Sequence, residues 1–371
     1  MIVSSNYKIP LYRPKITALT KKYVNECLNS SWISSKGKFV NLFEKSFKNF
    51  TKINFCTSVC NGTAGLHLAV LALGIKKNDQ VIVPTFTYIA SVNCIKYVDA
   101  TPVFVDSDLN NFQINMDHLK KLINKKTKAV IVPHLYGNVT DMELLKSLQN
   151  KFNFLIIEDC AEAVGSFFIK KHVGNFGDIS VFSFFGNKTV TTGEGGMVCS
   201  NNKNLIAKVI RLKSQGLHVT KKKNYYWHNV IGYNYRMTNI NAAIGYSQMK
   251  IINQILKKKK IITDTYKKLL TDLPIKFIKN DKKCINSNWL VTILLKNKNV
   301  KKKIIKLLEK EKIETRPCFY PAHSMPMYNK DKEFPNATLL SNNGMSLPSY
   351  PDLNLSQVLK ICNLIKKIFK K

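Results

Sequence analysis

Runs of apolar and β-branched residues recur along the first half of the chain, separated by segments with a helical pattern. The runs are continuous rather than alternating, as in strands that are covered on both faces. Strands are expected at residues 81–84, 102–106, 129–133, 154–159, 180–184 and 196–200. Helices are expected at residues 63–73, 117–123 and 141–150, the last two with Asp117 and Asp141 as N-caps. This order predicts an α/β fold with a mostly parallel sheet, in which ligands bind beyond the carboxyl ends of the strands.

The pattern changes after about residue 250. A lysine-rich helix is expected from residue 249 to about 270, followed by a strand at 289–295, a helix at about 300–311 and a terminal helix from about residue 356. The sequence therefore predicts a large domain over residues 1–250 and a smaller α/β domain over residues 251–371.

The net charge taken alone favours a nucleic-acid-binding protein, but the type and spacing of the cations do not. The chain has 371 residues, with 58 Lys or Arg, 23 Asp or Glu and a net charge of +35, which is typical of nucleic-acid-binding proteins. Only four of the cations are arginine, the side chain best suited to reading bases. The lysine runs at 221–223, 257–260, 301–303 and 370–371 are scattered, and we interpret them as solvated faces. A basic nucleic-acid-binding module stays open as a distant alternative.

Other features of composition indicate a soluble cytoplasmic protein. Mean hydropathy is −0.13, and no stretch approaches the roughly 20 apolar residues of a membrane helix. Residues 1–22 lack the apolar core of a secretory signal. The nine cysteines form no CxxC pair and no cluster with zinc spacing, so we expect reduced thiols and no bound metal.

Four polar clusters lie at expected strand ends or in loops. NGTA at 61–64 precedes a helix, where backbone N–H groups can bind a phosphate or be capped in the ordinary way. EDCAE at 158–162 follows a buried strand, where its carboxylates need a partner or serve as a helix cap. SFFGNKT at 183–189 holds Lys188 in an aromatic loop that can desolvate its amine into a nucleophile. GYNYRMT at 232–238 joins an arginine and an amide to two tyrosines, which is typical of a site.

These clusters, in this order, carry a specific resemblance. NGTAGLHL, EDCAEAVG, SVFSFFGNKTVTTGEGGMV and VIGYNYRMTNINAAIG resemble motifs of the DegT/DnrJ/EryC1/StrS family of nucleotide-sugar aminotransferases, and the likeness extends from about residue 9 to about 328. The resemblance implies the type I fold of pyridoxal-phosphate aminotransferases and a homodimer with shared active sites. It further implies glutamate as amino donor and a nucleotide-linked 4-keto-6-deoxy sugar as acceptor. The best match is GDP-4-keto-6-deoxymannose, giving GDP-perosamine for a surface polysaccharide of the O-antigen type.

The resemblance also implies roles for individual residues. Lys188 would form the Schiff base with pyridoxal phosphate, and Asp159 would bond the pyridine nitrogen. The remaining cofactor contacts would be Gly62, Thr63 and Ser183 at the phosphate, Asn234 at the phosphate from the other subunit, Tyr88 stacked on the ring, and Glu162 near the ring. Glu162 stands where the wider family usually has Gln, which leaves its contact open. Substrate contacts would be Trp227, Arg236, Arg316 and His323.

Several alternatives stay open at this point. His323 is equally well explained as a loop residue that caps a turn, and Trp227 as a side chain that packs under its loop. The acceptor could instead be a UDP- or dTDP-linked keto sugar. A sugar dehydratase of the same family fits less well, because those enzymes have histidine in place of the lysine that is present here as Lys188.

Overall fold

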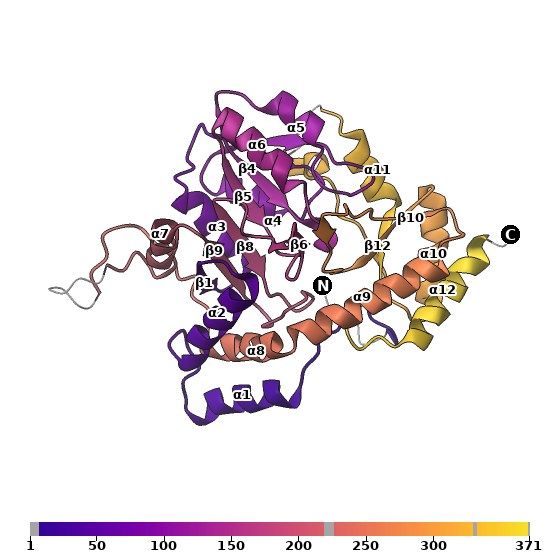
Figure 1. Cartoon of the computed structure of the whole chain (residues 1–371), viewed down its shortest axis with the longest axis horizontal. Coiled ribbons are helices and arrows are strands. Elements are labelled where there is room, and N and C mark those ends of the chain that lie inside the picture. Colours follow the sequence, from indigo (N-terminus) through magenta and orange to yellow (C-terminus); the bar gives the residue numbers. More distant parts are fainter. Residues whose placement is uncertain (1–6, 219–225, 329–331, 370–371) are drawn as a thin grey trace.

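The computed structural model describes residues 7–218, 226–328 and 332–369. Its centre is a seven-stranded sheet in the order β1-β9-β8-β5-β4-β2-β3 (Figure 1). The strands are β1 (Phe55–Val59), β2 (Gln80–Pro84), β3 (Thr101–Val105), β4 (Thr127–Pro133), β5 (Leu155–Asp159), β8 (Ile179–Ser183) and β9 (Gly196–Ser200). β3, β2, β4, β5 and β8 run parallel, whereas β9 is antiparallel to both β8 and β1. The predicted α/β fold with a mostly parallel sheet is confirmed.

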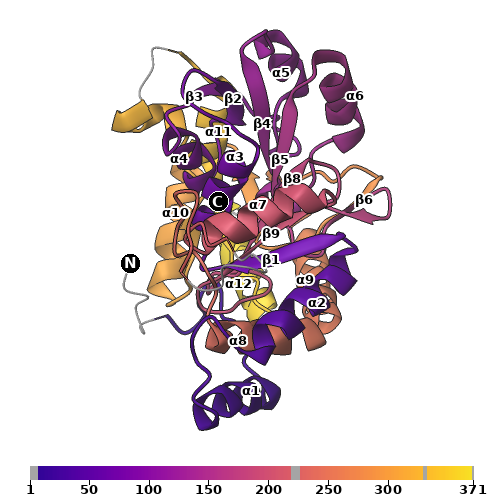
Figure 2. The same cartoon turned by 90° about the vertical axis from the view of Figure 1, so that its left-hand side faces the viewer.

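Helices cover both faces of this sheet. Alternate strand residues enter two separate cores, with Val81, Val83 and Ile157 in one and Ile82 and Ile156 in the other. The first core also contains residues of α3 (Gly62–Ala72), α4 (Ala90–Lys96) and α7 (Lys203–Lys213), and Figure 2 shows α7 crossing in front of the strands. The second contains residues of α1 (Ala18–Asn29), α2 (Lys38–Thr51), α5 (Met116–Leu122), α6 (Met142–Phe152) and α8 (Asn239–Lys250). Continuous apolar runs therefore form strands that are covered on both sides.

The helix caps agree with the sequence prediction at one helix and not at another. Asp141 is the N-cap of α6, where its carboxylate accepts the backbone N–H of Leu144. Asp117, predicted to cap the helix that begins there, is wrong as a cap: Asn115 caps α5 and accepts the N–H of His118. Asp117 instead lies in the first turn, where its negative charge is stabilised by the positive end of the helix dipole.

The C-terminal residues form a second, antiparallel sheet in the order β10-β12-β14-β13. Its strands are β10 (Ile275–Phe277), β12 (Val291–Leu295), β13 (Arg316–Pro317) and β14 (Gly344–Leu347), and its helices are α9 (Ile252–Leu269), α10 (Lys298–Lys310), α11 (Pro335–Asn343) and α12 (Leu355–Phe369). Three short strands, β6 (Phe167–Phe168), β7 (Lys171–His172) and β11 (Cys284–Ile285), form a third sheet. Short 3-10 turns lie at η1 (Leu135–Gly137), η2 (Ala322–Ser324) and η3 (Pro326–Tyr328). The single helix expected from residue 249 is in fact interrupted at Ile251, where α8 gives way to α9.

The lysine runs are not wholly solvated. Lys259 is fully buried, because the helical period turns one residue of the run at 257–260 toward the core, and its ammonium donates to the carbonyl of Ser349. Lys301 is also buried and donates to the carbonyl of Ser341. The runs at 221–223 and 370–371 lie outside the described residues. None of the described helices is long and apolar enough to cross a membrane.

Candidate active site

The carboxyl ends of the parallel strands bring the predicted catalytic residues to one edge of the sheet. Asp159 is the last residue of β5, and Ser183 is the last residue of the neighbouring β8. Glu162 lies in the turn after β5, and Lys188 lies in the loop after β8. The expectation that the site lies beyond these strand ends therefore agrees with the positions of all four residues.

Asp159 is buried, and other groups fix its orientation. One carboxylate oxygen accepts the hydroxyl of Ser91 at 2.6 Å, and the other accepts the backbone N–H of Ala161 at 3.1 Å. Ser91 comes from α4 and was not predicted from the sequence. These two donors hold a negative charge at the strand end, and charge-assisted hydrogen bonds of this kind are among the stronger ones in proteins.

Lys188 and Glu162 form an ion pair at the same edge. The Lys188 Nζ lies 3.7 Å from Glu162 Oε1, with the two side chains 13% and 6% exposed. Burial lowers the pKa of Lys188, while the charges of Glu162 and Asp159 act against that change. Burial raises the pKa of Glu162 to about 7, and the neighbouring Lys188 limits the rise. The other Glu162 oxygen accepts the backbone N–H of Tyr136 at 2.7 Å, which fixes the carboxylate. Burial thus opposes the charge on both groups, while their proximity favours it.

Two further side chains, also not predicted, hold the loop of Lys188. The indole N–H of Trp289 donates to the carbonyl of Asn187, and the hydroxyl of Tyr12 donates to the carbonyl of Lys188, both at 2.7 Å. The Lys188 Nζ also lies 4.0 Å from the centre of the Trp289 ring. Trp289 precedes β12 and Tyr12 belongs to the N-terminal segment, so no local pattern could connect either residue with this loop.

Gly62 and Ser183 meet at the start of α3. A Cβ at Gly62 would lie 3.0 Å from the Cβ of Ser183, so only glycine allows this approach without a shift. Asn61 caps the helix by accepting the N–H of Ala64, and Thr63 lies in the first turn. The N–H groups of Gly62 and Thr63 have no acceptor within the helix, so they are oriented to bind an anion.

The remaining predicted residues lie in other surroundings. Tyr88 is 58% exposed, with its ring centre 5.9 Å from that of Phe319. Asn234 is exposed and forms a backbone bridge with Ser214. Trp227 is half exposed, and its carbonyl accepts the N–H of His218.

The two predicted arginines differ in their partners. Arg236 forms a backbone bridge with Val59, and its buried Nε has no hydrogen-bond partner among the described residues. Arg316 forms an ion pair with Glu314 at 3.2 Å, and Glu314 also accepts the N–H of Leu11. The structure thus gives Arg316 an internal partner, whereas the buried Nε of Arg236 has none among the described residues.

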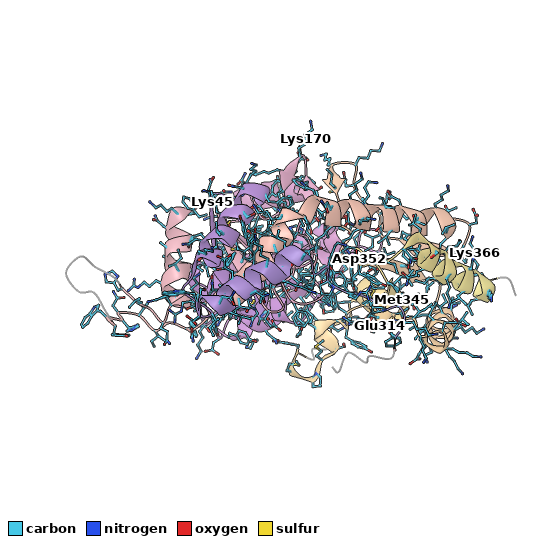
Figure 3. The ribbon with its side chains drawn as sticks, turned by 90° about the horizontal axis from the view of Figure 1, so that it is seen from below. Lys45, Lys170, Glu314, Met345, Asp352 and Lys366 are labelled. Atoms are coloured by element: carbon cyan, nitrogen blue, oxygen red, sulfur yellow. The ribbon has the colours of Figure 1, made fainter. Side chains whose placement is uncertain are left out.

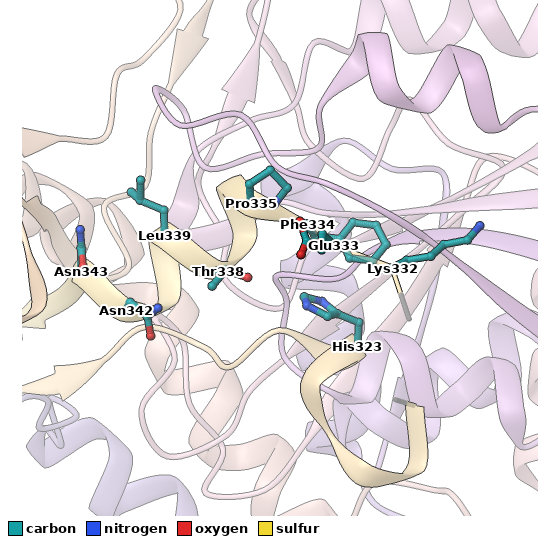
Figure 4. A pocket seen from close by; sticks show the side chains of 9 residues that line it. All are labelled: His323, Lys332, Glu333, Phe334, Pro335, Thr338, Leu339, Asn342 and Asn343. Carbon is teal, nitrogen blue, oxygen red and sulfur yellow. The ribbon is translucent and has the colours of Figure 1, made fainter. Parts of the chain in front are cut away.

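His323 is attached to the end of β2 and borders a cavity. Its Nδ1 lies 2.8 Å from the hydroxyl of Thr85, and its ring centre lies 4.7 Å from that of Phe334. Figure 4 shows His323 facing this cavity, whose other walls come from residues 332–343. Lys188, Asp159 and Glu162 do not line it. The bond to Thr85 agrees with a turn-holding role for His323 and leaves its ring edge beside the cavity.

A second buried cluster, of His134, Glu158 and Cys160, lies next to Asp159 in the chain. Its potential metal-binding atoms lie within 4.8 Å of one another. The Glu158 oxygens, however, already accept the backbone N–H groups of Gly174, Phe176 and Gly177, as well as a hydrogen bond with His134 at 3.1 Å. This carboxylate is therefore occupied in holding the turn before β8, and we assign the cluster a structural role.

Comparisons with known proteins identify the family of this chain. A sequence profile of the DegT/DnrJ/EryC1/StrS aminotransferase family matches residues 14–366. The fold and the match make this chain an aminotransferase. Within that class it belongs to the DegT/DnrJ/EryC1/StrS family.

Individual relatives and solved structures match nearly the whole chain. It is 49% identical to GDP-perosamine synthase of Escherichia coli O157:H7, over 97% of this chain and 98% of that protein. It is 46% identical to GDP-perosamine synthase of Vibrio cholerae, over 97% and 99%. Among solved structures, the putative sugar aminotransferase Spr1654 of Streptococcus pneumoniae in its PLP form gives a TM-score of 0.92 at 27% identity, covering 98% of this chain and 99% of that one. Helicobacter pylori PseC, an aminotransferase of pseudoaminic acid biosynthesis, gives 0.91 at 28%, with the same coverage.

The comparisons confirm the predicted family, enzyme class and aminotransferase fold. Because the pneumococcal structures include a PLP form and a PMP form, the predicted cofactor is confirmed at the level of the family. The roles of individual residues stay predictions.

Proposed function

We propose that this chain uses pyridoxal phosphate to transfer an amino group from glutamate to the keto group of GDP-4-keto-6-deoxymannose, giving GDP-perosamine. The observation that carries the proposal is the Lys188 amine, held 3.7 Å from Glu162 at the same sheet edge as Asp159. Two relatives that share 46–49% of their residues with this chain over nearly full length are GDP-perosamine synthases, which supports the choice of sugar.

The residues at the sheet edge fit the cofactor. The first N–H groups of α3, with Gly62 close against Ser183, suit its phosphate. Asp159 suits its ring nitrogen, because a fixed carboxylate keeps that nitrogen protonated. Tyr88, two residues before α4, has a ring exposed enough to stack on a ligand. When bound, pyridoxal phosphate supplies an aldehyde for an amine and a ring that accepts electrons from a carbon next to nitrogen.

The chain's own residues then hold and move protons. Burial favours the neutral form of the Lys188 amine, which is the form that can act as nucleophile and take a proton from a carbon. Glu162 lies 3.7 Å from that amine, so a small shift of either side chain, or one bridging water, would let the two exchange a proton as substrates change the local charge. Asp159 keeps its charge in place through Ser91 and Ala161, so no reorganisation is needed during the reaction.

The proposed assembly is a homodimer in which each active site uses residues of both chains. Asn234 is exposed and belongs to the segment that joins α7 to α8. The described end of that segment carries Tyr226 and Ile231, which are 89% and 88% exposed. Large apolar side chains exposed to this degree are typical of a surface that a partner covers. In the proposed dimer, Asn234 reaches the cofactor phosphate of the partner subunit.

The basic charge does not require a nucleic-acid partner. Lys45, Lys170 and Lys366 lie on three separate parts of the molecule (Figure 3), so these three lysines do not share one surface. A positive field of this kind attracts anionic substrates such as a nucleotide sugar or glutamate. We propose that the enzyme works in the cytoplasm and supplies an amino sugar for a surface polysaccharide, with Trp227, Arg236, Arg316 and His323 as candidate substrate contacts.

The test is a panel of acceptors with ¹⁵N-glutamate as donor. Purified enzyme with pyridoxal phosphate is mixed with GDP-, UDP- and dTDP-linked 4-keto-6-deoxy sugars, and the products are identified by mass spectrometry. The proposal expects ¹⁵N in a GDP-linked 4-amino sugar, at a kcat/KM well above that for the other nucleotides. Preferential labelling of a UDP- or dTDP-linked sugar would overturn the choice of substrate, and the absence of any labelled sugar would overturn sugar transamination itself.

A further inference from the structure

The loop that carries Lys188 is held by two distant aromatic residues at consecutive carbonyl groups. Trp289 donates its indole N–H to the carbonyl of Asn187, and Tyr12 donates its hydroxyl to the carbonyl of Lys188. Within the loop, the N–H of Lys188 bonds the carbonyl of Phe185. With both carbonyls fixed from outside, the backbone at Lys188 has little freedom to rotate, and the direction of its side chain is set.

Trp289 acts on the side chain of Lys188 as well as on its backbone. The Nζ lies 4.0 Å from the ring centre, well inside the distance of about 6 Å at which an aromatic face attracts a cation. Trp289 is only 4% exposed, so water screens this attraction little. Its ring also stacks near Tyr136, at an interplanar angle of 16°, and Tyr136 stacks on Phe319 at 13°. The stack fixes the ring in place beside the amine.

We propose that Trp289 is a positioning residue for Lys188: its N–H orders the loop, and its ring, together with Glu162, forms the resting place of the lysine ammonium. The inference rests on the proposed function, in which Lys188 is the reactive amine. For part of the transamination cycle Lys188 would not be covalently attached, and its free amine would then need another partner at the site. A ring face and a carboxylate keep that amine at the site, ready to return, although burial alone would favour its moving toward water.

The two contributions of Trp289 can be separated by substitution. Trp289→Phe keeps an aromatic face but loses the N–H, whereas Trp289→Leu loses both. Tyr12→Phe removes the hydroxyl that donates to the carbonyl of Lys188 and leaves the ring of Trp289 unchanged. Lys213 is a matched internal control, because it is a buried lysine that donates to the Thr57 hydroxyl and the Ser58 carbonyl, away from Trp289.

The first measurement needs no cofactor. Full-length protein freed of pyridoxal phosphate is labelled competitively with acetic anhydride across a pH series, and mass spectrometry of peptides gives the pKa of Lys188 and of Lys213. Loss of the ring face should lower the pKa of Lys188 by about one in Trp289→Leu. The change should be much smaller in Trp289→Phe, and Lys213 should not move. If the pKa of Lys188 were unchanged in Trp289→Leu, or if the pKa of Lys213 changed by the same amount, the role of the ring would be overturned.

The second measurement tests the role of the indole N–H. Hydrogen exchange of the amides at residues 188–192 should be several-fold faster in both Trp289→Phe and Tyr12→Phe, because each variant frees one carbonyl of the loop. If these amides exchanged as slowly in Trp289→Phe as in the original protein, the role of the indole N–H would be overturned. Because both measurements use cofactor-free protein, they can succeed even if the proposed transamination fails, and the two failures are therefore distinguishable.

Discussion

Lys188 and Glu162 each shift the pKa of the other, and this coupling is the main electrostatic feature at the level of single residues. Burial alone would neutralise both groups, whereas their proximity favours the ion pair. Asp159, in contrast, is held by two donors and has no cation within ion-pair distance among the described residues. One carboxylate thus serves the lysine, and the other is left to serve the cofactor ring.

Asp159→Asn should therefore reduce kcat by on the order of 10² or more, because a neutral amide cannot keep the ring nitrogen protonated by charge. Steady-state kinetics with fully cofactor-loaded protein measures this loss. Ser91→Ala is the matched comparison: it removes the 2.6 Å hydrogen bond but keeps the charge, and it should have a smaller effect. Near-normal kcat in loaded Asp159→Asn would refute the role of the carboxylate.

Glu162→Gln should change how stability depends on pH. Burial raises the pKa of Glu162 from 4.5 to about 7 in the fold, so between these values the folded chain binds more protons than the unfolded chain. This group therefore makes the protein less stable as pH rises through that range. Glutamine does not titrate, so the Tm of Glu162→Gln relative to the original protein should increase from pH 5 to pH 7.5, measured by scanning calorimetry without cofactor.

The control for this measurement is Glu143→Gln, which alters a glutamate that is 53% exposed and paired with Lys283 at the surface. Its Tm difference should vary less over the same pH range. A flat difference for Glu162→Gln would show that Glu162 does not titrate in this window.

At the level of secondary-structure elements, strong local patterns made the fold predictable. Six central strands were predicted within one or two residues, because each is a continuous apolar run between polar ends. β1 was not predicted, because polar residues at Thr57 and Ser58 interrupt the apolar run of this edge strand, Phe55–Val59. The positions of Lys188, Asp159 and Glu162 at one edge followed from the same strand order.

Contacts between distant elements could not be predicted in this way. Ser91 contacts the site from α4, Tyr12 from the N-terminal segment and Trp289 from just before β12. A local sequence pattern does not tell which of these elements pack against one another. The likeness to a family indicated the chemistry of the motifs but not these supporting contacts. Arg316 pairs with Glu314, only two residues away, whereas the hydrogen bond from the N–H of Leu11 to Glu314 is a further distant contact that no local pattern indicates.

Gly62→Ala tests the anion site at the start of α3. The new Cβ would lie 3.0 Å from Ser183 Cβ, so either the helix start or β8 must shift. We expect the affinity for pyridoxal phosphate to fall by about tenfold or more, from the 1–3 kcal/mol typical of overpacking. Absorbance titration with the cofactor measures the change. Gly186→Ala is the matched control, because its Cβ would meet no atom closer than 4.0 Å. Equal affinity in the two variants would contradict a phosphate site here.

At the scale of the whole molecule, the remaining predictions concern how its parts work together. The boundary between domains at residues 250 and 251 stays a prediction, although Ile251 does interrupt the helices there. Ile9 of the N-terminal segment pairs with Ile313 and enters the C-terminal core, and Tyr12, three residues further on, contacts the Lys188 loop. The N-terminal segment thus links the two parts of the chain at the site.

The shared-site dimer predicts complementation between two inactive chains. A Lys188→Ala chain is mixed with an Asn234→Ala chain under verified subunit exchange. Each mixed dimer should then contain one site with both changes and one with neither, so that it recovers about half of the original activity. If both parent variants have lost activity and the mixture stays inactive, Asn234 serves its own chain and the shared-site arrangement is wrong.

The most direct test of the central claim is to identify which lysine holds the cofactor. Enzyme loaded with pyridoxal phosphate is reduced with borohydride, which fixes the cofactor covalently to the amine that binds it, and the labelled peptide is then mapped by mass spectrometry. The account predicts the label on Lys188 and no comparable label in Lys188→Ala. A label on another lysine, or an equal yield in Lys188→Ala, would contradict the assignment of the active site.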